Sequence, residues 1–261
     1  METKAWEICQ HIMTAQREAG ELLLHARGVL AACKTDHRDV VTQYDCQVQQ
    51  LLVDRLREAL PEAKFYCEEN DQQDDLQAEH LFVIDPIDGT MNFVRHLNHS
   101  CISVAYMSRG QLLAGAVYNP YVEEMFHAVR GGGAFLNGKP IHTEEAPLSE
   151  TLICVGTAPY RTDLIQESFR RIQQLCRVGL DIRRQGSAAL DLCSVAAGRA
   201  GLYLELSTSL WDYAAGVLLV REAGGDCLSA QGEALPFDGS KPSIVAGSRQ
   251  ALADFWALPE A

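Results

Sequence analysis

The chain has 261 residues, 47% of them hydrophobic, and a formal net charge of −13. This is enough apolar material for one large core or two closely packed halves. A surface this acidic repels nucleic-acid phosphates and anionic membranes, so no nucleic-acid or membrane partner is expected. The nine cysteines are odd in number and include no Cys-x-x-Cys pair, which argues against a disulfide framework and favours a cytoplasmic location. No signal-peptide pattern is visible, and no segment approaches the roughly 18 apolar residues of a membrane span.

The first half is predicted to begin with two long helices, over residues 6–29 and 45–60, because apolar residues recur there at helical spacing. Short apolar runs follow, separated by turn signals such as Asn119-Pro120, and they are typical of an antiparallel meander. The Asn137-Gly138 step predicts one further tight hairpin. The strands predicted from these runs are 65–67, 81–84, 102–107, 112–118 and 124–128.

The second half is predicted to mix strands and helices. The expected strands are 152–156, 181–184, 202–206 and short runs near Cys227 and Ile244. The expected helices are 163–176, 187–197, 211–223 and one after Ser248. This order favours an α+β protein of layered sheets and helices over a barrel. No linker is visible near Pro147, so residues 1–147 and 148–261 are expected to pack tightly as two halves of a single unit, 1–261.

The most informative segment is Asp85-Pro-Ile-Asp88-Gly-Thr90, which ends an apolar run. Carboxylates are the hard oxygen ligands that Mg²⁺ prefers. A strand end followed by Asp-Gly-Thr can also expose backbone N–H groups that bind an anion. Taken alone, the same residues fit a plain turn with a helix cap equally well.

Two further acids change this balance. Glu68 directly follows the preceding predicted strand, and Asp212 lies in the first turn of an otherwise apolar helix. Each alone has a simple explanation, a solvated strand end for Glu68 and the helix dipole for Asp212. Together with Asp85 and Asp88 they favour a site for two Mg²⁺ ions about 4 Å apart.

These residues resemble a known family. The run Asp85-Pro-Ile-Asp88-Gly-Thr90-Met-Asn-Phe93, with Glu68-Glu69 upstream and Trp211-Asp212 downstream, closely resembles the inositol monophosphatase family of lithium-sensitive, magnesium-dependent phosphatases. The resemblance covers nearly the whole chain, including segments 39–45, 131–138, 183–192 and 222–225. It implies the layered αβαβα sandwich of inositol monophosphatase and fructose-1,6-bisphosphatase, and a homodimer.

The resemblance also implies a role for each site residue. It implies two to three Mg²⁺ ions per subunit and a water-orienting pair made by Thr90 and Asp45. The implied metal ligands are Glu68, Asp85, the main-chain oxygen of Ile87, Asp88 and Asp212. The implied catalytic residues are Asp45, Glu68 and Thr90. The implied substrate-binding residues are Asp88, Gly89, Thr90, Ser187, Ala188 and Glu205.

The function expected from this resemblance is Mg²⁺-dependent hydrolysis of a small phosphorylated polyol, inositol monophosphate, by metal-activated water. Glu205 stands where inositol phosphatases keep a carboxylate for ring hydroxyls, although an exposed strand residue is an equal alternative. Related enzymes share the metal site, so fructose 1,6-bisphosphate, histidinol phosphate, a 3'(2'),5'-bisphosphate nucleotide and NADP stay open as substrates. A metal- or phosphate-binding pseudoenzyme is the non-enzymatic alternative.

Several features depart from the family or could mislead. Cys67 stands where family members usually have glycine. Arg183 and Arg184 could contact substrate or a dimer partner, but ordinary salt bridges are the preferred interpretation. The run 133–139 is close to a phosphate-binding P-loop, yet Pro140 stands where that motif needs serine or threonine, so we interpret it as a hairpin. Asp85 and Asp88 are three residues apart rather than two, which disfavours an aspartyl-phosphate intermediate.

Overall fold

A computed structural model describes residues 2–34, 40–69 and 73–259 of the chain. Asp39, at the start of one family-like segment, and Asn70, which follows the Glu68-Glu69 pair, lie outside the described residues. Among the described residues, none of the helices combines the length and the apolar character needed to span a membrane.

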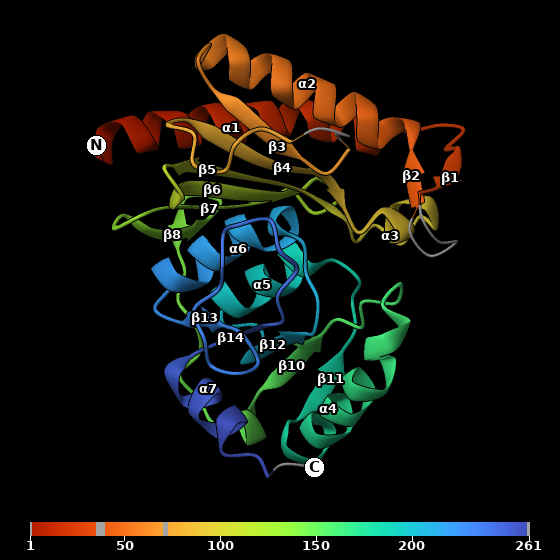
Figure 1. Cartoon of the computed structure of the whole chain (residues 1–261), viewed down its shortest axis with the longest axis vertical. Coiled ribbons are helices and arrows are strands. Elements are labelled where there is room, and N and C mark those ends of the chain that lie inside the picture. The colour runs from red at the N-terminus through yellow and green to blue at the C-terminus, as the bar shows by residue number, and fades with distance from the viewer. Residues whose placement is uncertain (1, 35–39, 70–72, 260–261) are drawn as a thin grey trace.

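Two helices form the outer layer of the first half. α1 (Glu2–Leu24) and α2 (Gln43–Ala59) lie across one face of a seven-stranded sheet (Figure 1). The predicted first helix ends earlier than expected, at Leu24 rather than near Val29, and Gly28, with a φ of 59°, lies in the loop that follows. The strands of this sheet, in spatial order, are β3 (Lys64–Cys67), β4 (Leu81–Asp88), β5 (Cys101–Ser108), β6 (Gln111–Asn119), β7 (Glu124–Val129), β8 (Gly133–Leu136) and β9 (Lys139–Pro140).

The sheet is an antiparallel meander from β4 to β9, as predicted, and β8 and β9 form the hairpin expected at Asn137-Gly138. The prediction is wrong for β3, which pairs with β4 in parallel. Parallel neighbours end at the same edge of a sheet. Cys67 lies opposite Ile84, so Glu68, the residue directly after β3, lies beside Asp85 of β4.

Three more layers complete the molecule. α5 (Ala188–Ala196) and α6 (Leu210–Glu222) lie between the first sheet and a second, five-stranded sheet (Figure 1). α4 (Ile165–Val178) and α7 (Arg249–Trp256) cover its far side (Figure 1). Its strands, in spatial order, are β11 (Asp181–Arg183), β10 (Leu152–Val155), β12 (Leu202–Glu205), β14 (Ile244–Gly247) and β13 (Asp226–Leu228). The predicted αβαβα sandwich is therefore confirmed.

The elements that the sequence did not predict are short. A two-stranded ribbon and a five-residue helix border the site, and two 3-10 helices lie in the second half. They are β1 (Ala31–Cys33), β2 (Val40–Thr42), α3 (Thr90–Val94), η1 (Leu148–Glu150) and η2 (Thr162–Leu164).

The hydrophobic core of the described residues has three parts. One lies between the outer helices and the first sheet, one surrounds α5 and α6 between the two sheets, and one lies between the second sheet and its outer helices. The middle part joins the two halves of the chain. Phe126 of the first sheet, Leu192 of α5 and Tyr203 of the second sheet all belong to it, and each is at most 1% exposed. Burial of such large side chains fixes how α5 and α6 sit against the first sheet. The relative position of the two halves decides the geometry of the candidate site.

Candidate active site

The site begins where β4 ends. Side chains alternate across a strand, so Asp85 and Asp88, three residues apart, would point to opposite faces of a regular one. Here the pairing with β5 shifts: Asp85 lies opposite Ser103 and Asp88 opposite Cys101. One extra residue of β4 is accommodated between these pairs, as in a β-bulge, next to Pro86, which lacks a backbone N–H. Because of this irregularity, the side chains of Asp85 and Asp88 point to the same face of the sheet and their carboxylates lie close together.

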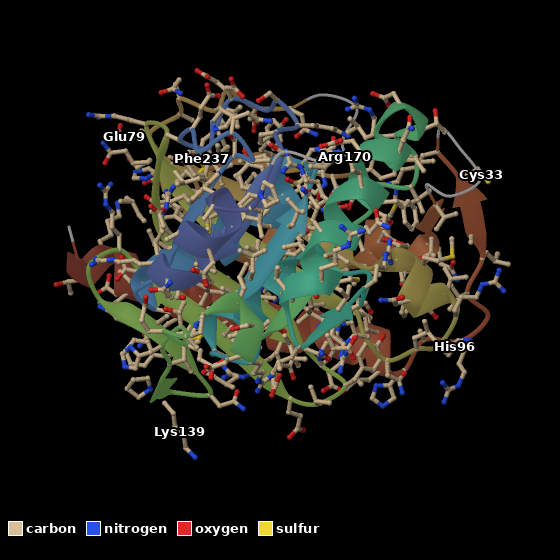
Figure 2. The ribbon with its side chains drawn as sticks, turned by 90° about the horizontal axis from the view of Figure 1, so that it is seen from below. Cys33, Glu79, His96, Lys139, Arg170 and Phe237 are labelled. Atoms are coloured by element: carbon tan, nitrogen blue, oxygen red, sulfur yellow. The ribbon has the colours of Figure 1, made fainter. Side chains whose placement is uncertain are left out.

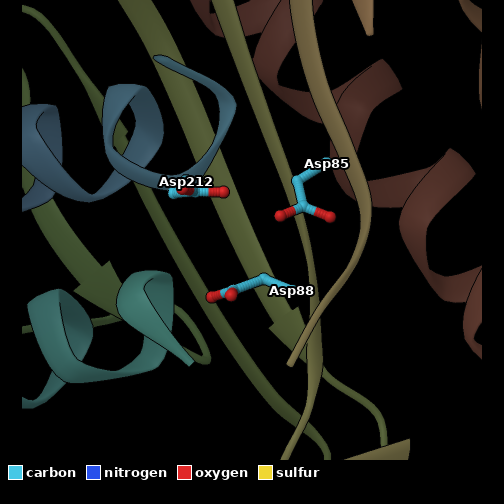
Figure 3. Close-up of side chains that lie close together, drawn as sticks. All are labelled: Asp85, Asp88 and Asp212. Carbon is cyan, nitrogen blue, oxygen red and sulfur yellow. The ribbon is translucent and has the colours of Figure 1, made fainter. Parts of the chain in front are cut away.

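Asp212 completes a cluster of three aspartates. Ligand oxygens of Asp85, Asp88 and Asp212 all lie within 4.8 Å of one another. Figure 3 shows the three side chains converging from the end of β4 and the start of α6. Asp212 is held at this helix start by a capping box with Ser209, whose backbone N–H donates to Asp212 Oδ2 at 2.9 Å.

Glu68 adds a fourth carboxylate. Its backbone N–H donates to the Ile84 carbonyl at 3.1 Å, which extends the β3–β4 pairing by one residue and brings its side chain into hydrogen-bonding contact with Asp85. Two carboxyl groups make such a contact only when a proton or a cation compensates their charge. On the outer side, the ammonium group of Lys34 lies 2.8 Å from Glu68 Oε1 and 2.5 Å from Glu69 Oε1.

Burial and mutual repulsion make this cluster electrostatically costly. Burial raises the pKa of Asp85 well above its usual range, and the neighbouring Glu68, Asp88 and Asp212 raise it further. Burial also raises the pKa of Asp212 well above its usual range, together with the charges of Asp88 and Glu68. Hard oxygen ligands that are crowded, buried and short of positive charge fit a divalent cation such as Mg²⁺.

Each aspartate is oriented by backbone or side-chain donors. Asp85 Oδ1 accepts the backbone N–H of Ile87 at 3.0 Å. Asp88 Oδ2 accepts Ser187 Oγ at 2.6 Å and the backbone N–H of Ala189 at 2.7 Å. Burial raises the pKa of Asp88 to about 6, while these two donors act in the opposite direction. The carboxylates are therefore positioned before any ligand arrives.

Thr90 and Asp45 form the pair that the resemblance implied. Thr90 Oγ1 lies 3.3 Å from Asp45 Oδ1 and 3.0 Å from the carbonyl oxygen of Ile87. Asp45 is fully buried in the first turn of α2, where its Oδ2 accepts the backbone N–H and the hydroxyl of Thr42. Burial raises the pKa of Asp45 to about 6. A buried carboxylate joined to a hydroxyl can accept a proton through that hydroxyl.

The carboxylates lie along a pocket of about 350 Å³, which the predicted substrate-binding residues Asp88, Gly89, Thr90, Ser187, Ala188 and Glu205 also line. Gly89 caps the start of α3 with a φ of 89°. A side chain there would meet the carbonyl oxygens of His99 and Gly186 at 3.1 and 3.2 Å. Only glycine fits easily in this turn, and the first N–H groups of α3, which have no partner within the helix, lie beside the pocket that Gly89 and Thr90 line.

Glu205 lines the far part of this pocket rather than projecting into solvent. Its Oε1 accepts the backbone N–H of Ala158 at 2.8 Å, and its Oε2 accepts the hydroxyl of Tyr203 at 2.6 Å. Burial raises the pKa of its carboxyl group. The side chain lies against Gly156, where a Cβ atom would be only 2.0 Å from Glu205 Oε2. The exposed-strand alternative for Glu205 is wrong.

The pocket also contains residues that the sequence analysis did not assign to it. These residues include Lys34, Pro159, Tyr160, Arg184, Asp191 and Lys241. They come from loops, a helix interior and a strand end. Arg184 and Asp191 lie in the family-like segment 183–192, but no pattern in the sequence indicated that any of them faces the pocket. The salt-bridge interpretation holds for Arg183, which pairs with Asp181. It is wrong for Arg184, which makes no ion pair with any described residue and lines the pocket instead.

The departure at Cys67 is explained by its place in the core, and the exposed His96 lies away from the metal-ligand cluster. Cys67 is fully buried in the core between the helices and the sheet, and burial raises the pKa of its thiol to about 12. Its backbone belongs to β3, so the position does not require glycine. His96, whose side chain projects from the surface in Figure 2, belongs to none of the metal-ligand clusters among the described residues.

A layered α+β fold with a carboxylate cluster beside an open helix start defines the class of metal-dependent phosphatases. The chain belongs to the inositol monophosphatase family, whose model matches residues 5–258. It is 37% identical over 215 residues to the Nus factor SuhB of Pasteurella multocida, covering 81% of this chain and 80% of that protein. It is also 37% identical over 212 residues to the fructose-1,6-bisphosphatase/inositol-1-monophosphatase of Thermotoga maritima, covering 80% and 79%.

A solved structure agrees with this placement. The crystal structure of the extragenic suppressor protein suhB from Bartonella henselae superposes with a TM-score of 0.89 at 31% sequence identity. The match covers 97% of this chain and 98% of that one. The whole sandwich, with the site between its two halves, is therefore the architecture of this family.

Proposed function

We propose that this protein hydrolyses the phosphate monoester of a small phosphorylated polyol, inositol monophosphate, in a Mg²⁺-dependent reaction with water as the nucleophile. The observation that carries the proposal is the convergence of Asp85, Asp88 and Asp212 within 4.8 Å, beside the turn at Gly89 and Thr90. Membership of a phosphatase family and the name of the Thermotoga maritima relative support it.

Two to three Mg²⁺ ions would be held by Glu68, Asp85, the carbonyl oxygen of Ile87, Asp88 and Asp212. Bound Mg²⁺ supplies positive charge for the phosphoryl group and lowers the pKa of water. Glu68 would act from the edge of this cluster, because its partner Lys34 already compensates part of its charge.

The remaining steps belong to the side chains and backbone of the chain. The Thr90 hydroxyl holds the attacking water, takes its proton and passes its own to Asp45 Oδ1, 3.3 Å away. The water oxygen then bonds to phosphorus, the ester P–O bond breaks, and the departing alcohol oxygen takes up a proton from solvent. The N–H groups of Gly89 and Thr90 would hold the phosphoryl oxygens.

The alcohol half of the substrate would lie toward Ser187, Ala188 and Glu205, which line the same pocket. Glu205 lines this space, and a carboxylate oxygen that already accepts one hydrogen bond can accept another from a substrate hydroxyl group. This favours a polyol over an alcohol without neighbouring hydroxyls.

The test is a phosphate-release screen with Mg²⁺ over inositol, sugar, nucleotide and histidinol phosphates, including NADP and fructose 1,6-bisphosphate. We expect the highest kcat/KM for inositol 1-phosphate, and loss of at least a thousandfold in Asp85→Asn. Asp54→Asn, an exposed aspartate on α2, is the matched control. Activity that survives in Asp85→Asn, or that does not need Mg²⁺, would overturn the proposal, and a different best substrate would replace inositol phosphate within the same chemistry.

A second candidate function comes from the name of the Pasteurella multocida relative, Nus factor SuhB. A protein that acts as a Nus factor would bind its partners through its surface and would not require catalysis in the pocket. Complementation of a strain lacking that relative separates the two, because a role as Nus factor independent of hydrolysis would survive Asp85→Asn. A pseudoenzyme would show Mg²⁺ or phosphate binding by calorimetry but no phosphate release with any substrate in the screen.

We further propose that residues 1–147 and 148–261 form a single folding unit, that two such units form a homodimer, and that the protein is cytoplasmic. The shared core and the hydrogen bonds between Asp88 and α5 support the single unit, and the family resemblance supports the dimer. One cooperative melting transition and a light-scattering mass of two chains are the expected results. An independently folded fragment 1–147, or a monomeric mass, would contradict them.

A further inference from the structure

The short helix α3, which carries Thr90, depends on the rest of the protein for its position. It spans only the five residues Thr90–Val94, and the residue that caps its start, Gly89, has no side chain to stabilise it. A helix this short has little stability of its own. The place of the Thr90 hydroxyl, on which the proposed reaction depends, must therefore be fixed by contacts with neighbouring segments.

Asn92 makes these contacts from within α3. Its side chain is 7% exposed, and its Nδ2 donates to the carbonyl oxygens of His99 and Gln185, each at 2.7 Å. Both partners are acceptors, so a side chain that satisfies both must offer two N–H groups. His99 belongs to the loop between α3 and β5, and Gln185 to the loop between β11 and α5. One amide group therefore joins the two halves of the chain.

The backbones of the two halves come close together beside this amide. A Cβ atom on Gly89 would lie 3.2 Å from the carbonyl oxygen of Gly186. A Cβ atom on Gly186 would lie 3.2 Å from Asn92 Nδ2 and 3.3 Å from Asn92 Oδ1. Because both residues lack a side chain, the loop at Gly186 packs directly against the turn at Gly89. A shift of this loop would therefore displace the turn.

The loop that Asn92 holds leads to a predicted metal ligand. Ser187 follows Gln185 by two residues, and its Oγ donates to Asp88 Oδ2 at 2.6 Å. The side chain of Gln185 is fixed as well, because its Nε2 donates to Asp191 Oδ1 on α5 at 3.0 Å. A continuous series of contacts therefore runs from Asn92, through the loop before α5, to the carboxylate of Asp88.

We propose that Asn92 is a positioning residue for the reaction. Its amide holds the turn at Gly89 and Thr90 and the loop that orients Asp88 in one relative geometry. Asn92 thus acts through Thr90 on the attacking water and through Ser187 on Asp88. This inference rests on the proposed function and adds a residue to it that touches neither the metal site nor the ester.

Asn92→Asp is the direct test. It keeps the size and shape of the side chain but replaces both donors with oxygens that repel the two carbonyl groups. Calorimetry with Mg²⁺ alone should give a dissociation constant at least tenfold above that of the wild type, because Asp88 is less well oriented. At saturating Mg²⁺, kcat for inositol 1-phosphate should fall at least tenfold. KM should change less than threefold, because the Thr90 hydroxyl holds the water rather than the ester.

Two further variants separate positioning from stability. Asn92→Ser keeps one donor, so its losses should be smaller, and it takes the place of Asn92→Asp if that protein does not fold. Asn119→Asp is the matched control, because Asn119 is also buried and its Oδ1 accepts the backbone N–H of Tyr121 at 3.1 Å, a bond that an aspartate retains. Its Mg²⁺ affinity and kcat should stay within about twofold of the wild type. Thermal melting checks that each protein is folded at the assay temperature.

A double variant tests the route to Asp88. Ser187→Ala removes the last contact in the series, so adding Asn92→Ser to it should weaken Mg²⁺ binding little more than the stronger single variant does. Losses that multiply would show that Asn92 acts independently of Ser187, and they would overturn the inference.

The remaining outcomes distinguish this inference from the proposed function. Folded Asn92 variants with wild-type Mg²⁺ affinity and kcat but a lower melting temperature would overturn the positioning role, since Asn92 would then serve the fold alone. If the wild type released no phosphate from any ester, the proposed function would be refuted instead. The Mg²⁺ titrations, which need no turnover, would still decide whether Asn92 orients Asp88.

Discussion

Asp88, at the end of β4, accepts a 2.6 Å hydrogen bond from Ser187 Oγ, although 99 positions of sequence separate the two residues. The same oxygen, Oδ2, accepts the backbone N–H of Ala189, in the first turn of α5. A carboxylate of the first half thus caps a helix of the second half, where the helix dipole favours negative charge. This contact ties the cluster of aspartates to the layer that completes the pocket.

The first prediction concerns Ser187. In Ser187→Ala the hydroxyl that holds Asp88 is lost, so Asp88 is less well oriented and Mg²⁺ affinity should fall by about tenfold or more. The loss of the helix cap should also lower the free energy of unfolding by about 1 kcal/mol. Calorimetric Mg²⁺ titration and thermal melting measure the two effects. Ser194→Ala, on the same helix with its hydroxyl bonded to the Leu190 carbonyl, is the control and should retain full affinity.

The second prediction concerns the pair formed by Thr90 and Asp45. Because proton removal needs both groups, Thr90→Val and Asp45→Asn should each lower kcat by about a hundredfold or more. The double variant should lose little more than either single variant, since the two groups act as one unit. Steady-state kinetics of all four proteins at saturating Mg²⁺ gives the coupling. Losses that multiply in the double variant would show that the residues act independently.

The third prediction concerns Gly156, whose lack of a side chain gives Glu205 its place. A Cβ atom in Gly156→Ala would lie 2.0 Å from Glu205 Oε2 and force the carboxylate away from Ala158 and Tyr203. We expect kcat/KM for inositol 1-phosphate to fall about tenfold, as for a lost charged hydrogen bond. Hydrolysis of p-nitrophenyl phosphate, which has no ring hydroxyls, should change far less. Equal losses on both substrates would contradict a role for Glu205 in polyol recognition.

The fourth prediction is a pH dependence of stability that Asp45 causes in the metal-free protein. Burial raises the pKa of Asp45 from 3.8 to about 6, so between these pH values the folded state binds more protons than the unfolded state. Stability from this group therefore falls as pH rises, by about 1 kcal/mol between pH 5 and 7.5. Asp45→Asn removes the titrating group, so its free energy of unfolding relative to wild type should increase over that range.

Urea unfolding at pH 5.0 and 7.5 in the presence of a chelator measures this difference. Asp54→Asn, in the exposed part of the same helix, should shift stability equally at both pH values. A wild-type minus Asp45→Asn difference that does not change with pH would show that burial does not hold the pKa of Asp45 near 6.

The fifth prediction concerns lithium. Li⁺ is a small, hard cation, and the carboxylate cluster offers hard oxygen ligands within 4.8 Å of one another. We expect Li⁺ in the millimolar range to inhibit phosphate release at saturating Mg²⁺, with Na⁺ at the same concentration as the ionic-strength control. Full activity at high millimolar Li⁺ would separate this protein from the lithium-sensitive behaviour that the family resemblance implies.

Much of the architecture followed from local patterns. Helical spacing placed α2, and turn signals such as Asn137-Gly138 placed the hairpins of the meander. The direction of β3 did not follow, because a short apolar strand looks the same in a parallel or an antiparallel pair. That direction matters, since it places Glu68 beside Asp85.

For the pocket too, local sequence predicted some residues and missed others. Aspartates in a motif could be recognised, but Arg184 could not be distinguished from Arg183, because neighbouring exposed arginines carry the same local signal. Only the packing of one guanidinium against Gly186, and the pairing of the other with Asp181, gives them different surroundings.

The sequence by itself determined which groups are available: carboxylates after apolar strands, a glycine turn beside them, and enough apolar residues for layered sheets. The sequence also determined the family, because each family motif is a continuous run of residues that can be recognised without the structure. Only the tertiary structure decided that the β4 irregularity brings Asp85 and Asp88 together, that α5 and α6 deliver Ser187 and Asp212 to them, and that Arg184 and Lys241 line the same pocket. The physical reason is that such contacts join residues far apart in the chain, and the packing of layers, not local sequence, fixes their distances.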